Sequence, residues 1–383
     1  MKYMGSKRSM LKNGLGDLLL EQAVLFDRFV DIFAGGGFVS WFVAERIGVP
    51  VLAVDLQKYS AVLCEAVISR TGSLEAEVLC EKWITKAKRK RNASYLWKKA
   101  KHISNQPIVV KPYVDQARIL CEIKSLIGPI WNAYGGHYLS PTQALTFDYL
   151  LDNLPDKYEE RIVCLAACIA AASECVASPG HTAQPFQPTE GAGKYILESW
   201  RQDPLERCKT NLELLCPKFA KVAGCVITAD AQNVISQLNS RDLVFIDPPY
   251  SSVQYSRFYH VLETIARCNK QISVSGVGRY PALEERPQSK FSNISQAKDA
   301  LKFILKGIAE KGSTIIFTFP SGDSSNGLSG DYIKAVASEW FQVEDKNTIE
   351  GQFSSLGGNN GNRKARNKSS EMILLLRPKS ISA

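Results

Sequence analysis

A carboxylate, two prolines and an aromatic residue stand together in Asp247-Pro248-Pro249-Tyr250. The exocyclic amine of a nucleobase is a poor nucleophile because its lone pair is delocalised into the ring. Two acceptors on its N–H groups offset the positive charge that develops during attack, and the Asp247 carboxylate and Pro248 carbonyl can supply both. The prolines fix φ and remove competing donors, while Tyr250 offers a flat face for an extruded base. The tetrapeptide therefore favours chemistry on a planar amine, with a rigid turn as the alternative.

A second candidate site is the glycine-rich turn Ala34-Gly35-Gly36-Gly37. Such a turn between a strand and a helix lets a ligand approach the backbone, and the helix N-terminus offers N–H groups to it. The dinucleotide fingerprint requires a further glycine at position 40, where this chain has serine, so NAD is disfavoured. Asp55 follows Gly37 by 18 residues, close to the spacing of the carboxylate that accepts hydrogen bonds from ribose hydroxyls. We expect a ribose-bearing cofactor, against the alternative of a simple turn and a helix-capping acid.

Short apolar runs must position these residues. The patterns at 29–33, 38–47 and 51–54 predict a strand, a helix and a strand, which together with the glycine turn make one βαβ unit. Strand patterns return at 225–228, 243–246, 314–319 and 372–376, and 301–310 has the spacing of a helix that covers one sheet face. We predict an α/β fold with a Rossmann-like sheet and helices on both faces. Residues 1–70 and 218–383 form its catalytic, cofactor-binding domain, and 71–217 is an inserted, mainly helical region.

Composition restricts the class of protein further. Lys and Arg total 47 against 38 for Asp and Glu, and the net charge of +9 favours an anionic partner such as nucleic acid. The longest apolar run, at 162–172, is too short to span a membrane, and residues 1–8 do not have the pattern of a signal peptide. Ten scattered cysteines without a Cys-x-x-Cys pair, and only four histidines, predict free thiols and no metal site. We expect a cytoplasmic protein without a membrane partner.

The order of the motifs resembles that of the Dam-like, or α-group, adenine-specific DNA methyltransferases, which use S-adenosyl-L-methionine. The glycine turn is similar to the family's cofactor loop, and 247–250 matches its catalytic tetrapeptide. Residues 2–7 resemble its N-terminal motif, although Gly5-Ser6 stands where the family often has two glycines, and 363–375 resemble its last loop and strand. The resemblance implies a class I methyltransferase sheet with 71–217 as the target-recognition region. It implies cofactor contacts from Tyr3, Lys7, Asp31, Phe33, Ala34, Gly35, Gly37, Asp55, Leu56, Asp230, Ala231 and Asp247.

Candidate DNA contacts lie in three places. Basic residues without any acid run from Lys82 to Lys101, interleaved with aromatic residues, and can neutralise phosphates; a solvated helical face is the alternative. The loop at 178–194 is long and rich in Gly and Pro, as functional loops often are, although its histidine can equally be an ordinary surface residue. The segment after the tetrapeptide starts within reach of a base. The candidates are Lys88, Arg89, Lys90, Arg91, His181, Gln254, Arg257 and Arg363.

The sequence therefore predicts a site-specific methyltransferase that transfers a methyl group to the N6 amine of a flipped adenine in double-stranded DNA. The expected setting is restriction-modification or DNA marking in a bacterium or phage, with a cognate restriction endonuclease as a possible partner. The alternatives are transfer to RNA adenine or to cytosine N4, and a DNA-binding regulator that has the fold without turnover. Because phosphate contacts carry no sequence information, the basic run predicts affinity for DNA and not a particular target sequence.

Overall fold

The structure is a computed structural model that describes residues 7–104, 109–269, 271–354 and 366–379, with only the backbone described at 347–354 and 366–369. The chain divides into two compact units. The helical unit comprises the described residues of Gly72–Lys218 and Ser256–Arg286. The sheet unit comprises those of Gly5–Thr71, Phe219–Tyr255 and Pro287–Ala383. The helical unit thus combines 72–218 with 256–286, and the assignment of 71–217 to an inserted recognition region stays a prediction.

The sheet unit is built on seven strands in the order β3-β2-β1-β4-β7-β9-β8. The first five are parallel, and β9 and β8 complete the sheet as antiparallel strands. Strand order reverses beside β1, which lies between β2 and β4, and ligands of open α/β sheets bind at such a switch point. The strands are β1 (Arg28–Asp31), β2 (Val51–Asp55), β3 (Cys225–Thr228), β4 (Asp242–Ile246), β7 (Thr314–Pro320), β8 (Phe341–Ser354) and β9 (Arg366–Pro378).

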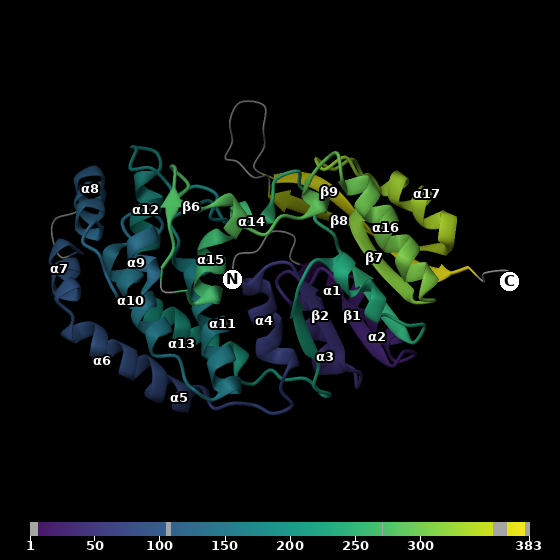
Figure 1. The fold of residues 1–383 in the computed structure, drawn as a ribbon, viewed down its shortest axis with the longest axis horizontal. Coiled ribbons are helices and arrows are strands. Elements are labelled where there is room, and N and C mark those ends of the chain that lie inside the picture. Colours follow the sequence, from purple (N-terminus) through teal and green to yellow (C-terminus); the bar gives the residue numbers. More distant parts are fainter. Residues whose placement is uncertain (1–6, 105–108, 270, 355–365, 380–383) are drawn as a thin grey trace. The chain divides into compact units, whose positions relative to one another are not determined.

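Side chains of the central strands are buried on both faces of the sheet, as expected for parallel strands covered by helices. One face packs Val30, Val244 and Phe317 against α16 and α17 in a single hydrophobic cluster, and Figure 1 shows these two helices beside β7–β9. The helices of this unit are α1 (Arg8–Lys12), α2 (Leu15–Ala23), α3 (Phe38–Arg46), α4 (Lys58–Ile68), η2 (Ala231–Gln237), η4 (Lys290–Ser292), α16 (Ala297–Glu310) and α17 (Gly330–Trp340).

The alternation of the strands separates apolar from polar positions. Because successive side chains point to opposite faces, the residues that alternate with this cluster belong to the other face. Asp31 and Asp55 occupy such positions at the last residues of β1 and β2, and Thr318 and Glu371 do so in β7 and β9. Asp247 follows β4 in the same alternation. One face of the sheet therefore carries polar groups from five neighbouring strands near the carboxyl ends of the parallel ones.

The described part of the helical unit consists mainly of helices (Figure 1). Within it the long helix α11 packs against α13 and α15. The elements are α5 (Ala76–Leu79), the π-helix η1 (Cys80–Thr85), α6 (Lys86–Ala93), α7 (Tyr95–Ser104), α8 (Val110–Cys121), α9 (Pro129–Tyr134), α10 (Pro141–Asp152), α11 (Tyr158–Cys175), α12 (Gly193–Trp200), α13 (Pro204–Leu215), α14 (Tyr255–Phe258), α15 (His260–Arg267), β5 (Val274–Ser275), β6 (Tyr280–Pro281) and η3 (Leu283–Glu285).

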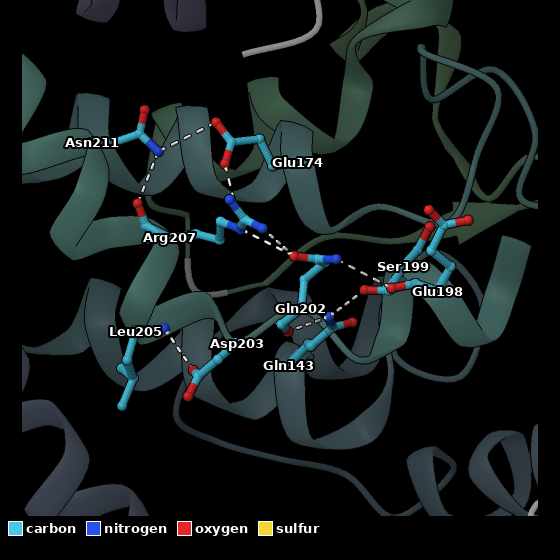
Figure 2. A network of polar contacts seen from close by, with 9 residues as sticks. All are labelled: Gln143, Glu174, Glu198, Ser199, Gln202, Asp203, Leu205, Arg207 and Asn211. Atoms are coloured by element: carbon cyan, nitrogen blue, oxygen red, sulfur yellow. Dashed lines mark hydrogen bonds and ion pairs between the residues drawn. The ribbon is translucent and has the colours of Figure 1, made fainter.

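A network of polar side chains joins the start of α10 to the ends of α12 and α13 in the helical unit. Gln143, in a capping box at the start of α10, donates to the carbonyl oxygens of Ser199 and Gln202 at 2.9 and 2.8 Å. Arg207 donates from Nε to the Gln202 side chain at 3.1 Å, and the Asp203 carboxylate caps α13. Figure 2 shows this network around the ends of α12 and α13. Such satisfied contacts fix the helix ends.

The elements confirm the coarse prediction of a mixed α/β protein with a central, mostly parallel sheet. The ranges predicted for β1, β2, β3, β4 and β7 match the observed strands to within two residues at each end. Strand β8 and the hairpin of β5 with β6 were not predicted. Among the described residues, no helix is long and apolar enough to cross a membrane.

Candidate active site

The glycine turn after β1 has the backbone conformation that its sequence indicates. Gly35 and Gly37 have φ of 52° and 78°, in the left-handed region where glycine carries no steric penalty. A Cβ at position 37 would lie 3.0 Å from the Trp41 indole nitrogen, so a side chain would crowd the turn. The amide of Gly35 donates to the Asp55 carboxylate at 2.8 Å, and the other oxygen of that carboxylate accepts from Gln57 N at 2.8 Å. The ends of β1 and β2 are thus joined around the turn.

Asp31, at the end of β1, is a buried acid beside this turn. It is 1% exposed and accepts hydrogen bonds from the Ser40 hydroxyl at 2.7 Å and from Phe33 N at 3.3 Å. Burial raises the pKa of Asp31 to about 7. The nearby carboxylates of Asp247 and Asp55 also raise this pKa, whereas the hydrogen bonds to Asp31 oppose the rise. Three acids therefore lie close enough to interact at the switch point of the sheet.

Asp247 is held by groups from two other segments of the sheet unit. Its Oδ1 accepts from the Thr318 hydroxyl at 2.9 Å and lies 3.0 Å from the Lys7 ammonium. The same ammonium lies 2.7 Å from Glu371 Oε2. Lys7 is 5% exposed and Asp247 18% exposed, so the pair is mostly removed from water while the acid still reaches the surface of the site.

The charges of Lys7 and Asp247 depend on each other. Burial by itself lowers the pKa of Lys7, but the carboxylates of Asp247 and Glu371 outweigh it and raise the pKa overall. Burial raises the pKa of Asp247 and Glu371 adds to this, whereas Lys7 and Thr318 oppose it without cancelling it. The ammonium is therefore firmly charged, and it is shared between two acids.

The proline loop after Asp247 is fixed by a buried amide. Asn326, 0% exposed, donates to the carbonyl oxygens of Pro249 at 2.7 Å and Phe291 at 3.0 Å. Within the part of the chain that the structure describes, the Pro248 carbonyl accepts no hydrogen bond. Tyr250 packs at the margin of the apolar cluster, as does Phe33, whose ring meets that of Phe291 edge-on at 5.2 Å. The loop thus presents one carboxylate and one carbonyl from a stiff backbone.

Three of the remaining cofactor candidates lie next to β2 or at the start of η2, and one lies outside the described residues. Asp230 precedes the 3-10 helix η2 and accepts from Gln232 N at 2.9 Å, and Ala231 after it is buried. Leu56 is half-buried directly after β2. Asp230 lies close to β2, since Ala229 N donates to Asp55 O at 3.0 Å. Tyr3 lies outside the described residues.

The basic run of the helical unit separates into surface and core residues. Lys88, Arg89 and Lys90 are exposed on α6. Arg91 is 6% exposed, donates to the Thr146 hydroxyl at 2.9 Å and stacks on the Trp97 ring. Burial lowers the pKa of Arg91 to about 10. As placed, Arg91 serves the packing of α6 on α10, so the prediction of a phosphate contact now rests on its three neighbours.

The loop at 178–194 is anchored, and His181 is not a surface residue. His181 is 8% exposed, its Nδ1 accepts from Ala183 N at 3.2 Å, and its ring lies 5.0 Å from that of Phe258. The neighbouring Thr182 carbonyl accepts from Tyr138 at 2.6 Å and from the His260 ring nitrogen Nε2 at 2.7 Å. His181 is therefore buried in this conformation, its contact with DNA stays a prediction, and the loop is held by side chains that the sequence analysis did not single out.

The other DNA-contact candidates also divide into residues that are engaged with the protein and residues that are exposed. The Gln254 amide is engaged with the backbone of Ser289, to which it donates at 2.9 Å and from which it accepts at 2.7 Å. Arg257 is exposed and donates to the Tyr280 hydroxyl at 3.0 Å. Arg363 lies outside the described residues. Gln254 therefore orders the segment after the Asp-Pro-Pro-Tyr loop, and Arg257 presents a charge on the helical unit.

Fold and site together define an α/β protein that gathers a glycine turn and three interacting acids at the carboxyl edge of its parallel strands. The model of the D12 class N6 adenine-specific DNA methyltransferases matches residues 3–113 and 161–291. The chain belongs to this family, which confirms the resemblance of its motifs. It is also similar to the modification methylase LlaI of Lactococcus lactis subsp. lactis, with 24% identity over 301 residues. That alignment covers 78% of this chain but only 43% of the relative.

Three residues of the site escaped the sequence analysis. Thr318 is a polar residue that interrupts the apolar run 315–319 of β7, and that interruption is a signal which could have marked it. Glu371 precedes an apolar run, but its link to Lys7 joins residues 364 positions apart. Asn326 lies in a Ser- and Gly-rich loop without any distinguishing pattern. Tertiary contacts alone bring these groups to the motifs.

Proposed function

We propose that the protein is an S-adenosyl-L-methionine-dependent methyltransferase that modifies the N6 amine of adenine in double-stranded DNA. The observation that carries the proposal is the placement of Asp247 and a stiff Pro-Pro backbone on the same sheet edge as the glycine turn. The sheet is then a Rossmann-like class I methyltransferase sheet, and the D12 family membership supports the same reaction.

The chemistry of the acids supports the cofactor. Asp31, Asp55 and Asp247 interact electrostatically at the switch point, which favours a cationic ligand and opposes a pyrophosphate. When bound, S-adenosyl-L-methionine supplies a methyl group to the amine nitrogen, with the electron pair of the broken carbon–sulfur bond remaining on sulfur. Gly35 and Gly37 would admit the cofactor to the backbone, and Asp55 and Asp230 would hold its hydroxyl and adenine groups.

The residues of the tetrapeptide act on the base. The Asp247 carboxylate and the Pro248 carbonyl accept the two N–H groups of the adenine amine, which localises the lone pair on nitrogen and stabilises the positive charge formed there. Asp247 then takes the proton that the nitrogen releases and passes it to water. Tyr250 stacks on the flipped base. Asn326 and Thr318 keep these acceptors in place by holding the loop carbonyl and the carboxylate.

The helical unit would supply the contacts to the duplex. Lys88, Arg89 and Lys90 are exposed in a segment without acids, and Arg257 is exposed on α14, so these side chains can neutralise phosphates. The unit would serve as the target-recognition region. A relative named as a modification methylase supports a restriction-modification setting in the cytoplasm of a bacterium, for a protein encoded by the bacterium or by a phage, with a cognate endonuclease as partner.

Transfer of a radiolabelled methyl group tests the proposal. Wild-type protein should label duplex DNA rich in adenine, and digestion should return the label as N6-methyladenine. Asp247→Asn should lower the rate by about 1,000-fold or more, because the negative charge is lost and a donating NH2 group replaces one accepting oxygen of the carboxylate. The exposed acid Asp299 on α16 provides a matched control, since Asp299→Asn should retain full activity.

Three outcomes would contradict the proposal. Near-normal transfer by Asp247→Asn would show that the assigned acceptor is not needed. Label on RNA or on cytosine N4 instead of DNA adenine would assign a different substrate. Absence of transfer to any of these, with DNA binding intact, would indicate a regulator without turnover.

A further inference from the structure

The Lys7 ammonium lies closer to Glu371 than to the catalytic acid. The distances are 2.7 Å to Glu371 Oε2 and 3.0 Å to Asp247 Oδ1. Lys7 is 5% and Glu371 12% exposed, so solvent screens this pair less than a surface ion pair. One buried cation is thus divided between two carboxylates, of which the proposed mechanism uses only one.

Strand pairing places Glu371 in this position. Glu371 opposes Pro320 in the antiparallel pairing of β7 with β9, and Thr318 lies two residues earlier in β7, on the same face. Diagonal neighbours of this kind are within reach of a shared partner. Thr318 donates to Asp247 and Glu371 accepts from Lys7, so two adjacent strands hold the carboxylate and its counterion from one side.

The charge balance explains why a second acid is useful. A lysine that paired with Asp247 alone would neutralise it and weaken it as an acceptor for an amine that becomes positive. With Glu371 present, two carboxylates face the one ammonium of Lys7, and a net negative charge remains beside the exocyclic amine of the bound adenine. Lys7 still keeps Asp247 ionised and oriented.

We propose that Glu371 is a positioning residue that draws the charge of Lys7 away from Asp247 and so preserves the strength of Asp247 as an acceptor. The proposal rests on the methyltransferase function proposed above. The charged groups that face Asp247 are Lys7, Glu371 and Asp31, with Asp55 beyond Asp31. Among these, Glu371 is the acid that contacts the lysine.

The pH profile of Glu371→Gln tests this role. Asp247 must be ionised to accept, so activity falls as the pH drops through its pKa. Glu371 raises that pKa, and its neutral replacement should therefore move the acid limb of kcat to lower pH, by about one unit on the scale of close charge pairs. The plateau of kcat should fall about 10-fold because Lys7 then neutralises Asp247 more fully. A residue that only supported the fold would lower the amount of active protein without moving the limb.

Matched variants complete the experiment. Glu371→Asp keeps the charge and should restore the limb to within about 0.3 units, and it serves also if the glutamine variant folds poorly. The partly exposed Glu344 on β8 is the control, since Glu344→Gln should leave the profile unchanged. The dissociation constant of S-adenosyl-L-methionine, measured by calorimetry, should change less than about 3-fold in Glu371→Gln.

An acid limb that stays in place or moves to higher pH in Glu371→Gln would overturn the positioning role, as would an unchanged plateau. A limb equally displaced in Glu371→Asp would do so as well, because the charge would then not be the cause. Failure of the methyltransferase function is separate: it would appear as a wild-type protein without transfer, or as an active Asp247→Asn variant.

Discussion

Asp31 in the sheet unit and Asp148 in the helical unit are two buried acids with the same perturbation. Burial raises the pKa of each to about 7. Asp148 uses its two oxygens to accept from Ile130 N and Trp131 N at 2.8 Å, which caps the first turn of α9. Asp31 instead faces two further carboxylates. The comparison teaches that burial and a shifted pKa do not by themselves mark a functional site; the neighbouring charges distinguish one from the other.

A second comparison between the two units shows the same difference in the use of buried polar groups. In the helical unit the amide of Gln143 and the carboxylate of Asp148 are consumed by backbone groups at helix ends. In the sheet unit, like charges gather at strand ends and a single buried ammonium is shared between two of them. Polar groups that satisfy each other stabilise a fold, whereas like charges held together cost stability and are expected where a ligand compensates them.

Removal of the Asp148 carboxylate should have the largest effect of the changes that probe this comparison. Asp148→Ala leaves two buried N–H groups without an acceptor, at about 1–3 kcal/mol each, so the free energy of unfolding should fall by about 3 kcal/mol. Chemical denaturation measures this loss. Methyl transfer per folded molecule should be unchanged. Asp152→Ala, one turn along α10 and half-exposed, is the control with an expected cost below about 1 kcal/mol; equal costs for the two variants would refute the capping role.

Replacement of Asp55 should affect cofactor binding, whereas replacement of Asp148 should affect stability. Asp55→Ala should weaken S-adenosyl-L-methionine binding by about 10- to 100-fold, or about 1.4–2.7 kcal/mol, because charge-assisted hydrogen bonds to hydroxyls are lost. Isothermal titration calorimetry measures the dissociation constant. Asp27→Ala provides the control, since Asp27 is an exposed acid that pairs with Arg241. If binding by Asp55→Ala matched that of wild type, the ribose role would be wrong.

The sequence contains the apolar runs and the acids of the site, but not the partners that hold them. Asp31, Asp55 and Asp247 follow recognisable strands, so their meeting at one sheet edge can be predicted from alternation and parallel topology. Thr318 and Glu371 join them only through the register of β7 with β9, which local patterns do not encode. The burial of Arg91 shows a related limit, because a basic run does not reveal which face of its helix packs inward.

The pH dependence of the free energy of unfolding has the smallest expected effect, and it measures Asp31 and Asp148 separately. An aspartate has a pKa near 3.9 in the unfolded chain and about 7 in Asp31 of the folded protein. Between about pH 4 and 7 the folded state therefore holds a proton that the unfolded state has released, so the free energy of unfolding falls as pH rises, by about 1.4 kcal/mol per pH unit and per acid. Asp31→Asn and Asp148→Asn should each remove one such contribution between pH 5 and 6, as measured by denaturant titration.

The cofactor should distinguish the two contributions. S-adenosyl-L-methionine carries a positive sulfonium, which favours the ionised form of a nearby acid. The slope of the free energy of unfolding against pH has one contribution from Asp31 and one from Asp148. Saturating cofactor should therefore remove the contribution of Asp31 and leave that of Asp148 unchanged. A slope reduced equally in both variants by cofactor would mean that the ligand stabilises the whole protein without contacting the charge at Asp31. A slope unchanged in Asp31→Asn without cofactor would show that Asp31 is already ionised in the folded protein.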